Sequence, residues 1–317
     1  MRILFMGTPE FALNSLKTLD ENHDVIGIFT KIDKPNSRGK KIKFNPVKQY
    51  GLDNDITVYQ PNSVKIEETI ELVRGLNPDL IVVVAYGKIL PQELIDIPEK
   101  GIINVHSSLL PKYRGAAPIH AAIINGEKES GVTIMDIVKE LDAGDIILQV
   151  QTPINEMDTL EDLHDRLAVI GSEALLKAVS MIESGIAVRT PQDEAKVTFV
   201  KPIKKEECEI HWDHSMERIY NFIRGLNPFP SSYSFCNEKL YKIYFVEKYD
   251  RIYDGEFGEV VDLVKGKGPI IKVLDGSLII TSVKPENKRL MTGADLVNGN
   301  YIKIGEKFSI GSKVIQL

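Results

Sequence analysis

Residues 101–118 have the sequence GIINVHSSLLPKYRGAAP, which begins with the pattern of a buried strand. The apolar run at 102–106 is short and becomes polar only toward its end, as expected of a parallel strand that reaches the carboxyl edge of an α/β sheet. Side chains alternate along a strand, so Asn104 and His106 share one face and Val105 points to the other. The turn and small residues that follow predict a shaped loop at this edge, where α/β folds build their sites.

A second apolar run, at residues 132–138, ends just before a loop that contains Asp142. We expect Asp142 to lie opposite His106. An amide, an imidazole and a carboxylate together suit transfer of an acyl group to an amine, because the carbonyl oxygen gains negative charge and the nitrogen must lose a proton. Asn104 and His106 are candidate donors to that oxygen, and Asp142 is the candidate to orient His106 and to carry off the proton. Alone, each residue is more often a structural hydrogen-bonding group.

The wider pattern alternates between the two kinds of element. Strand patterns occur at 2–6, 25–29, 80–85, 102–106 and 132–138, and helical patterns occur at 9–20, 63–76, 116–125 and 159–183. This alternation predicts an α/β fold with a doubly wound, mostly parallel sheet and right-handed crossovers. The first turn, GTPE at residues 7–10, lacks the second and third glycines of a dinucleotide fingerprint, which disfavours a nicotinamide dehydrogenase.

After residue 188 the pattern changes. Residues 189–206 are typical of an extended linker, a short helix follows at 216–224, and the remaining chain has turn signals at Asp254-Gly255 and Asp275-Gly276. We therefore expect a catalytic domain at 1–188 and a small β-barrel domain at 207–317. A second domain that only stabilises or dimerises the first is the alternative.

The chain resembles the formyltransferases that use 10-formyltetrahydrofolate, and among them those that formylate methionyl initiator tRNA. The resemblance rests on the motifs above and on the segments 2–12, 131–135, 141–145, 191–194 and 227–230. It covers essentially the whole chain and is weakest after about residue 244. It implies transfer of the formyl group to the α-amino group, with Asn104, His106 and Asp142 as catalytic residues and an OB-like C-terminal barrel that binds tRNA.

The resemblance also implies a slot for the pterin ring of 10-formyltetrahydrofolate. A rigid turn that caps the sheet is a compatible interpretation, because a flat heterocycle needs a rigid apolar slot. The residues implied to bind the folate are Ser108, Leu109, Leu110, Pro111, Ile89, Leu90 and Leu141.

A local excess of positive charge stands out against a net charge of -6 and a pI near 5.7, which by themselves argue against nucleic-acid binding. The insertion at about 31–48 holds seven Lys and Arg against one acid, Asp33. A solvated loop is the simpler interpretation, but the resemblance implies a basic loop that enters the acceptor end of the initiator tRNA. The proposed tRNA contacts are Lys34, Arg38, Lys40, Lys41, Lys43 and Arg114. Arg114 can equally pair with a carboxylate.

Composition sets the remaining limits. The 317 residues are 43% hydrophobic and 26% charged, and no apolar stretch of membrane-spanning length occurs. We expect a cytosolic monomer that does not contact the membrane. The two cysteines form no ligand-spaced motif, so we expect reduced thiols and no metal. Two rival functions remain: a formyltransferase acting on an amino sugar nucleotide, and a non-catalytic folate- or RNA-binding protein.

Overall fold

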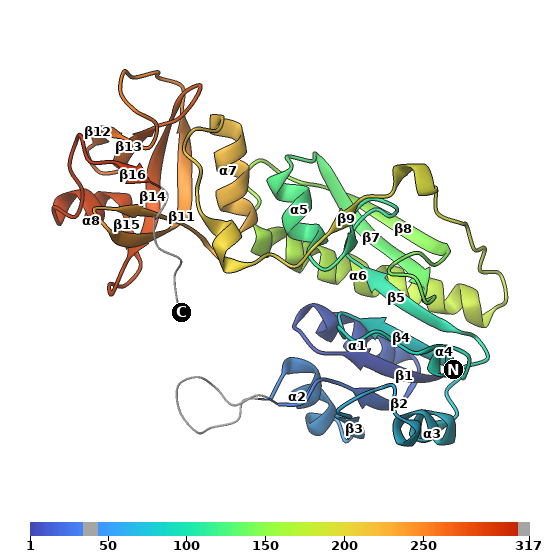
Figure 1. Cartoon of the computed structure of the whole chain (residues 1–317). Helices are drawn as coiled ribbons and strands as arrows, with labels where there is room; N and C mark the ends of the chain where they lie inside the picture. The colour runs from blue at the N-terminus through green and yellow to red at the C-terminus, as the bar shows by residue number, and fades with distance from the viewer. Residues whose placement is uncertain (34–43, 310–317) are drawn as a thin grey trace. The chain divides into compact units, whose positions relative to one another are not determined.

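The computed structural model describes residues 1–33 and 44–309 (Figure 1). The chain divides into two compact units. The first comprises Met1–Pro118, Glu129–Pro153 and His164–Val200, and the second comprises Ile119–Lys128, Ile154–Leu163 and Lys201–Leu317. Within the described ranges, no helix is long and apolar enough to cross a membrane.

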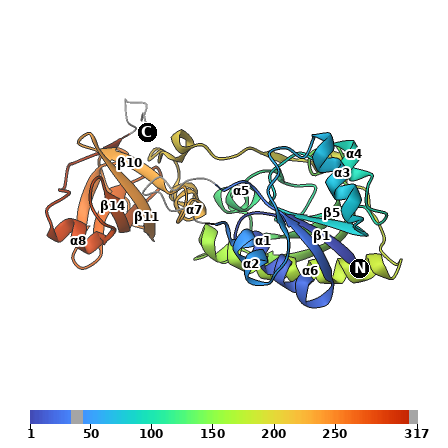
Figure 2. The same ribbon diagram turned by 90° about the horizontal axis from the view of Figure 1, so that it is seen from below.

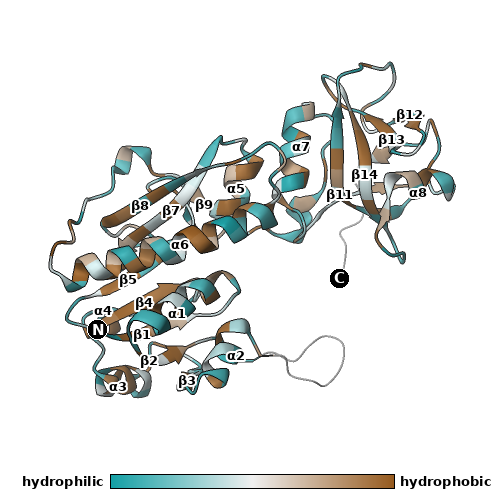
Figure 3. Cartoon of the chain, turned by 180° about the vertical axis from the view of Figure 1, so that it is seen from behind, coloured by the Kyte–Doolittle hydropathy of each residue, from teal (hydrophilic) through white to brown (hydrophobic). Residues whose placement is uncertain are grey.

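The first unit is built on a seven-stranded sheet of order β3-β2-β1-β4-β5-β7-β8. Its strands are β1 (Arg2–Gly7), β2 (Asp24–Phe29), β3 (Val58–Tyr59), β4 (Leu80–Val84), β5 (Ile102–His106), β7 (Glu129–Asp136) and β8 (Ile146–Pro153). The strands from β3 to β5 pair in parallel, and β7 and β8 are antiparallel. The doubly wound, mostly parallel sheet is confirmed. Its central strands are apolar along their length, as strands covered on both faces are (Figure 3).

Helices cover both faces of this sheet (Figure 2). The helices are α1 (Phe11–Asn22), α2 (Pro46–Asp53), α3 (Glu67–Leu76), α4 (Gln92–Ile95) and α6 (Leu160–Glu183), while nearly all of α5 (Pro118–Ile124) belongs to the second unit. Helix α6 approaches the sheet at Gly171, where an added Cβ would lie 3.2 Å from Val105. Ile102 packs instead into the core cluster that holds Val73 of α3 and Leu94 of α4. By alternation along β5, Asn104 and His106 lie on this second face, away from α6.

The second unit is a curled antiparallel sheet of order β12-β13-β14-β11-β10-β16. Its elements are α7 (Met216–Gly225), β10 (Ser232–Cys236), β11 (Lys239–Tyr249), β12 (Val260–Val264), β13 (Gly268–Lys272), β14 (Ser277–Pro285), β15 (Met291–Thr292), α8 (Gly293–Asn298) and β16 (Phe308–Ser309). An isolated bridge between Glu259 and Lys307 links the two edges of the sheet. This partial closure fits the predicted small barrel.

The strand that leads to Asp142 ends at the other edge of the sheet than predicted. Strand β7 runs antiparallel to β5, with His106 opposite Thr133 and Ile103 opposite Asp136. Its carboxyl end therefore lies at the amino end of β5, three residues or roughly 10 Å from His106 along the strand. The loop that contains Asp142 therefore starts at the edge of the sheet opposite to the predicted one. It reaches His106 only by folding back toward the carboxyl end of β5. Helix α2 and strand β8 were not predicted.

Candidate active site

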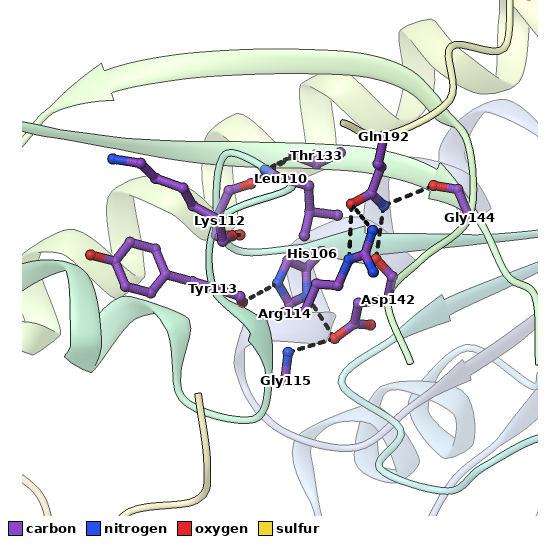
Figure 4. Close-up of polar contacts among 11 residues, drawn as sticks. His106, Leu110, Lys112, Tyr113, Arg114, Gly115, Thr133, Asp142, Gly144 and Gln192 are labelled. Atoms are coloured by element: carbon purple, nitrogen blue, oxygen red, sulfur yellow. Dashed lines mark hydrogen bonds and ion pairs between the residues drawn. The ribbon is translucent and has the colours of Figure 1, made fainter. Parts of the chain in front are cut away.

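His106 ends strand β5 with 6% of its surface exposed, and both ring nitrogens face polar atoms (Figure 4). Nε2 lies 3.0 Å from the carbonyl oxygen of Tyr113. Since a carbonyl oxygen only accepts, Nε2 carries a hydrogen and donates it there. Nδ1 lies 3.7 Å from Oδ2 of Asp142. The nitrogen that faces the carboxylate is therefore the one free to take up a proton.

Asp142 lies in the loop between β7 and β8 and is held in an uncommon backbone conformation. Its φ is 49°, in the left-handed region, which Asp tolerates better than most residues. The Gly115 N–H donates to Oδ2 at 2.7 Å. Oδ1 has no hydrogen-bond partner among the residues that the structure describes, and the side chain is 15% exposed. One carboxylate oxygen is thus fixed and the other is open to a ligand.

Asn104 lies two residues before His106 on the same face of β5. It is partly exposed, and within the described ranges its amide makes no side-chain hydrogen bond. The amide is therefore available as a donor beside His106.

The loop predicted to bind folate is fixed by one buried hydroxyl. Thr133 of β7 is fully buried, and its Oγ1 donates to the Ser108 carbonyl at 2.7 Å and accepts from the Leu110 N–H at 3.1 Å. Gln149 of β8 donates both to this hydroxyl and to the Leu110 carbonyl. The Ser108 hydroxyl donates to the Lys112 carbonyl at 2.7 Å. These hydrogen bonds tie the loop to β7, to β8 and to itself, and they hold it in one conformation.

The other predicted folate residues differ in exposure. Leu90 and Leu110 are 6% and 4% exposed and pack inward, whereas Ile89 and Leu141 are 69% and 58% exposed. Leu109 packs over the backbone of Gly131, and the Pro111 carbonyl accepts from the Thr198 N–H. Ile89 and Leu141 therefore have free apolar surface for a ligand, while Leu90 and Leu110 mainly support the loops.

Arg114 pairs with a carboxylate, which is the second of the two roles considered for it. Its side chain is 4% exposed, and Nη2 lies 2.7 Å from Oε1 of Glu194. Nε and Nη2 also donate to Oε1 of Gln192, at 3.0 and 2.9 Å. The guanidinium is thus buried against a carboxylate and an amide, and the tRNA contact of Arg114 stays a prediction.

Gln192, like Thr133 and Gln149, is a residue of this site to which the sequence assigned no role. It lies in the segment interpreted as a linker, yet it is 9% exposed and donates to the carbonyls of Asp142 and Gly144, each at 2.8 Å (Figure 4). In the sequence, the segment PQDE at 191–194 carries only the family resemblance. A polar residue in an apparent linker carries no periodic signal of burial.

The remaining predicted tRNA contacts, Lys34, Arg38, Lys40, Lys41 and Lys43, lie outside the described residues. The described base of this insertion is tied by an ion pair between Lys48 and Asp33, and Lys48 also donates to Gln60 at 2.7 Å. In the part of the chain that the structure covers, no group of three or more His, Cys, Asp or Glu is arranged to hold a metal ion.

Comparison with known proteins follows this division of the chain. Residues 1–179 match the formyl transferase family, and residues 202–301 match the formyl transferase C-terminal domain. A methionyl-tRNA formyltransferase of Fusobacterium nucleatum is 54% identical over 308 residues, which cover 97% of this chain and 99% of the relative. The methionyl-tRNA formyltransferase of Moorella thermoacetica is 44% identical over 307 residues, covering 96% of this chain and 98% of the relative.

Solved structures share the fold at lower identity. HypX from Aquifex aeolicus in complex with tetrahydrofolic acid has a TM-score of 0.66 and 19% identity, covering 96% of this chain and 48% of HypX. An N-formyltransferase from Helicobacter canadensis, in complex with folinic acid and dTDP-3-aminofucose, has a TM-score of 0.62 and 21% identity, covering 88% of this chain and 98% of that one.

Proposed function

Because the chain belongs to the formyl transferase family, and within it to the methionyl-tRNA formyltransferases, we propose that it transfers the formyl group of 10-formyltetrahydrofolate to the α-amino group of methionyl initiator tRNA. It is an enzyme of one-carbon transfer. The observation that carries the proposal is the site at the end of β5, where a buried His106 faces the partly exposed Asp142 beside an amide without a bonded partner in the described chain. A merely folate-binding protein has no use for that set.

The polar groups of the site fit a formyl donor. Bound 10-formyltetrahydrofolate supplies an electrophilic formyl carbon to the amine. Asn104 offers an amide N–H to the oxygen on which negative charge develops. His106 donates from Nε2 to Tyr113 already, so only a proton on Nδ1 can reach the substrate. We therefore assign oxyanion binding to Asn104 first, with His106 contributing as an imidazolium.

Asp142 has two tasks in this proposal, one for each oxygen. Oδ2 faces Nδ1 of His106 and stabilises the positive charge that a proton places on the ring. Oδ1 is the open oxygen, and it takes the proton that the attacking amine must lose, directly or through a water molecule. The bond between the formyl carbon and N10 of the folate then breaks, and N10 takes up this proton, so that tetrahydrofolate leaves as a neutral amine. No covalent intermediate with the protein is needed.

We propose that the polynucleotide part of the substrate binds outside this site. The lysines and the arginine of the 34–43 insertion are the proposed contacts to the acceptor end, together with cations of the C-terminal unit. The candidates in that unit are Lys239, Lys242, Lys248, Lys284, Lys288, Arg289 and Lys303. Lys248 is already held by Glu156 and Glu217, which makes it the weakest of these candidates. A monomer that works in the cytosol, with functional domains at 1–188 and 207–317, completes the proposal.

The test is formyl transfer from 10-formyltetrahydrofolate to methionyl initiator tRNA, methionyl elongator tRNA, free methionine and an amino sugar nucleotide in parallel. Selective formylation of the initiator is the expected result. Formylation of the sugar nucleotide alone would replace the substrate but keep the chemistry. Folate binding without formylation of any of the four amines would return the protein to the non-catalytic alternative.

A further inference from the structure

The loop that carries Asp142 needs support from elsewhere in the unit. Asp142 has its φ at 49°, and such backbone conformations persist only where the surroundings determine them. Two residues on, Gly144 lies so close to Asp136 that an added Cβ would be 1.8 Å from its carbonyl oxygen. Because β7 ends at the far edge of β5, this loop also has to be held against His106 after folding back.

Gln192 supplies that support through all four hydrogen bonds of its carboxamide. Nε2 donates to the carbonyls of Asp142 and Gly144, and Oε1 accepts twice from Arg114. A primary amide has two donor hydrogens and two acceptor lone pairs, so the group is saturated. One of the two carbonyls that accept from Nε2 is that of Asp142, the residue with the left-handed φ.

Arg114 and Gln192 are themselves fixed by the strand pairing around them. Thr190 and Ile146 exchange two backbone hydrogen bonds, at 2.8 and 2.9 Å, which places Gln192 beside the start of β8. Farther on, β9 (Phe199–Val200) pairs in parallel with β6 (Arg114–Gly115). Residues 190–200 thus form a strap across both loops of the site, and the strap also holds Gly115, the donor to Asp142.

We propose that Gln192 is a positioning residue for formyl transfer: its carboxamide holds the Asp142 carboxylate in reach of His106 and of the attacking amine. The proposal rests on the proposed function and deepens it. It assigns Gln192 no contact with substrate. Its effect passes through Asp142, and this route separates it from a residue that only stabilises the unit.

Gln192→Glu is the sharpest perturbation, because it keeps the size of the side chain and its contact with Arg114. The two hydrogens given to Asp142 and Gly144 are lost, and a carboxylate oxygen then faces two carbonyl oxygens. Gln192→Met removes the same donors without adding charge, and it serves if the first variant does not fold. Gln151→Glu, at an exposed glutamine of β8, is the matched control for the change of charge.

The experiment measures kcat and KM for methionyl initiator tRNA and for 10-formyltetrahydrofolate in the full chain. Misplacing a reacting group by about 1 Å can cost about 100-fold, so we expect Gln192→Glu to lower kcat by about 10- to 100-fold with both KM values within about twofold. Single-turnover rates in the Asp142→Asn background complete a double-mutant cycle. There, Gln192→Glu should change the rate by less than about twofold, because the group it positions is already gone.

Three outcomes overturn the inference. They are a kcat within about twofold of the parent in both folded Gln192 variants, an equal loss in Gln151→Glu, and an undiminished loss in the Asp142→Asn background. Failure of the proposed function looks different, since the parent protein would then not formylate methionyl initiator tRNA at all. A parent that is active and an Asp142→Asn variant that is impaired leave the result on Gln192 decisive by itself.

Discussion

Replacing Thr133 with valine removes one buried hydroxyl and keeps the shape of the side chain. The hydroxyl donates to the Ser108 carbonyl and accepts from the Leu110 N–H. After the replacement, both main-chain groups lie in a region closed to water and lack this partner, while Gln149 keeps its bond to the Leu110 carbonyl. Leaving a buried polar group without a partner costs about 1–3 kcal/mol. Two such groups predict a loss of about 2–6 kcal/mol in the stability of the first unit.

Thr133→Val should affect function only through the binding of 10-formyltetrahydrofolate. The loop at 108–111 is the proposed folate site and lies beside the catalytic groups without including them. We expect the KM for 10-formyltetrahydrofolate to rise at least about tenfold, while the KM for methionyl initiator tRNA stays within about twofold. Thr133→Ser keeps the hydroxyl and loses a methyl group worth about 1 kcal/mol, and it should restore the folate KM.

Thermal and urea unfolding of Thr133→Val, Thr133→Ser and Thr152→Val measure these differences. Thr152 of β8 is also buried, but its hydroxyl has no hydrogen bond to a residue in the described ranges, so Thr152→Val should be nearly neutral. If Thr133→Val is no less stable than Thr152→Val, or if its folate KM is unchanged, the hydroxyl does not organise the loop and the argument is refuted.

Three further predictions test separate parts of the account. His106→Ala and Asp142→Asn should each lower kcat more than about tenfold, with tRNA affinity and the folded state retained; a smaller loss, measured by formylation of methionyl initiator tRNA, removes that residue from the mechanism. Replacing Lys40, Lys41 and Lys43 with alanine should weaken tRNA binding and reduce the slope of log affinity against log salt concentration by about 2 to 3. An unchanged slope would mean that the loop is only solvated. Tyr86 is fully buried, and in the described structure its hydroxyl has no hydrogen-bond partner, so Tyr86→Phe should stabilise the protein by about 1 kcal/mol near neutral pH. Burial raises the pKa of Tyr86 to about 12 from its usual 10.0. Between these two pH values the unfolded chain loses a proton that the folded chain keeps, so the stability of the folded state falls as pH rises. The stability of the parent should therefore fall more steeply in this range than that of Tyr86→Phe.

The sheet was predictable because its strands carry their own signals. A short apolar run such as LIVVV in β4 has few structures open to it other than a strand covered on both faces. The alternation of Asn104 and His106 then follows from strand geometry alone. Helix boundaries were predicted less accurately, since α1 begins at Phe11 and α3 at Glu67, two and four residues after the predicted starts.

Strand direction was not available from the sequence, and the error at β7 shows the consequence. An apolar run indicates a strand and leaves its direction open; only the pairing of His106 with Thr133 shows that β7 is antiparallel. Asp142 was correctly grouped with His106, although the loop reaches it by a different path. The partner of Arg114 was not predictable for a related reason, because its pairing with Glu194 is a contact across 80 residues of chain.

The same limitation explains why the support of Asp142 was invisible before the structure. Where a loop folds back over a sheet, its main-chain N–H and C=O groups have no partners in a helix or strand. Those groups must then form hydrogen bonds with another part of the chain. Here they are satisfied by a segment whose Pro, Gln and Asp are typical of a linker. Composition predicts that such a segment lacks helix or strand of its own, but it does not say whether neighbouring elements hold it. The carboxamide of Gln192 satisfies the carbonyl of Asp142, whose φ is left-handed, so loss of that carboxamide is expected to leave an enzyme that still folds but has a lower kcat.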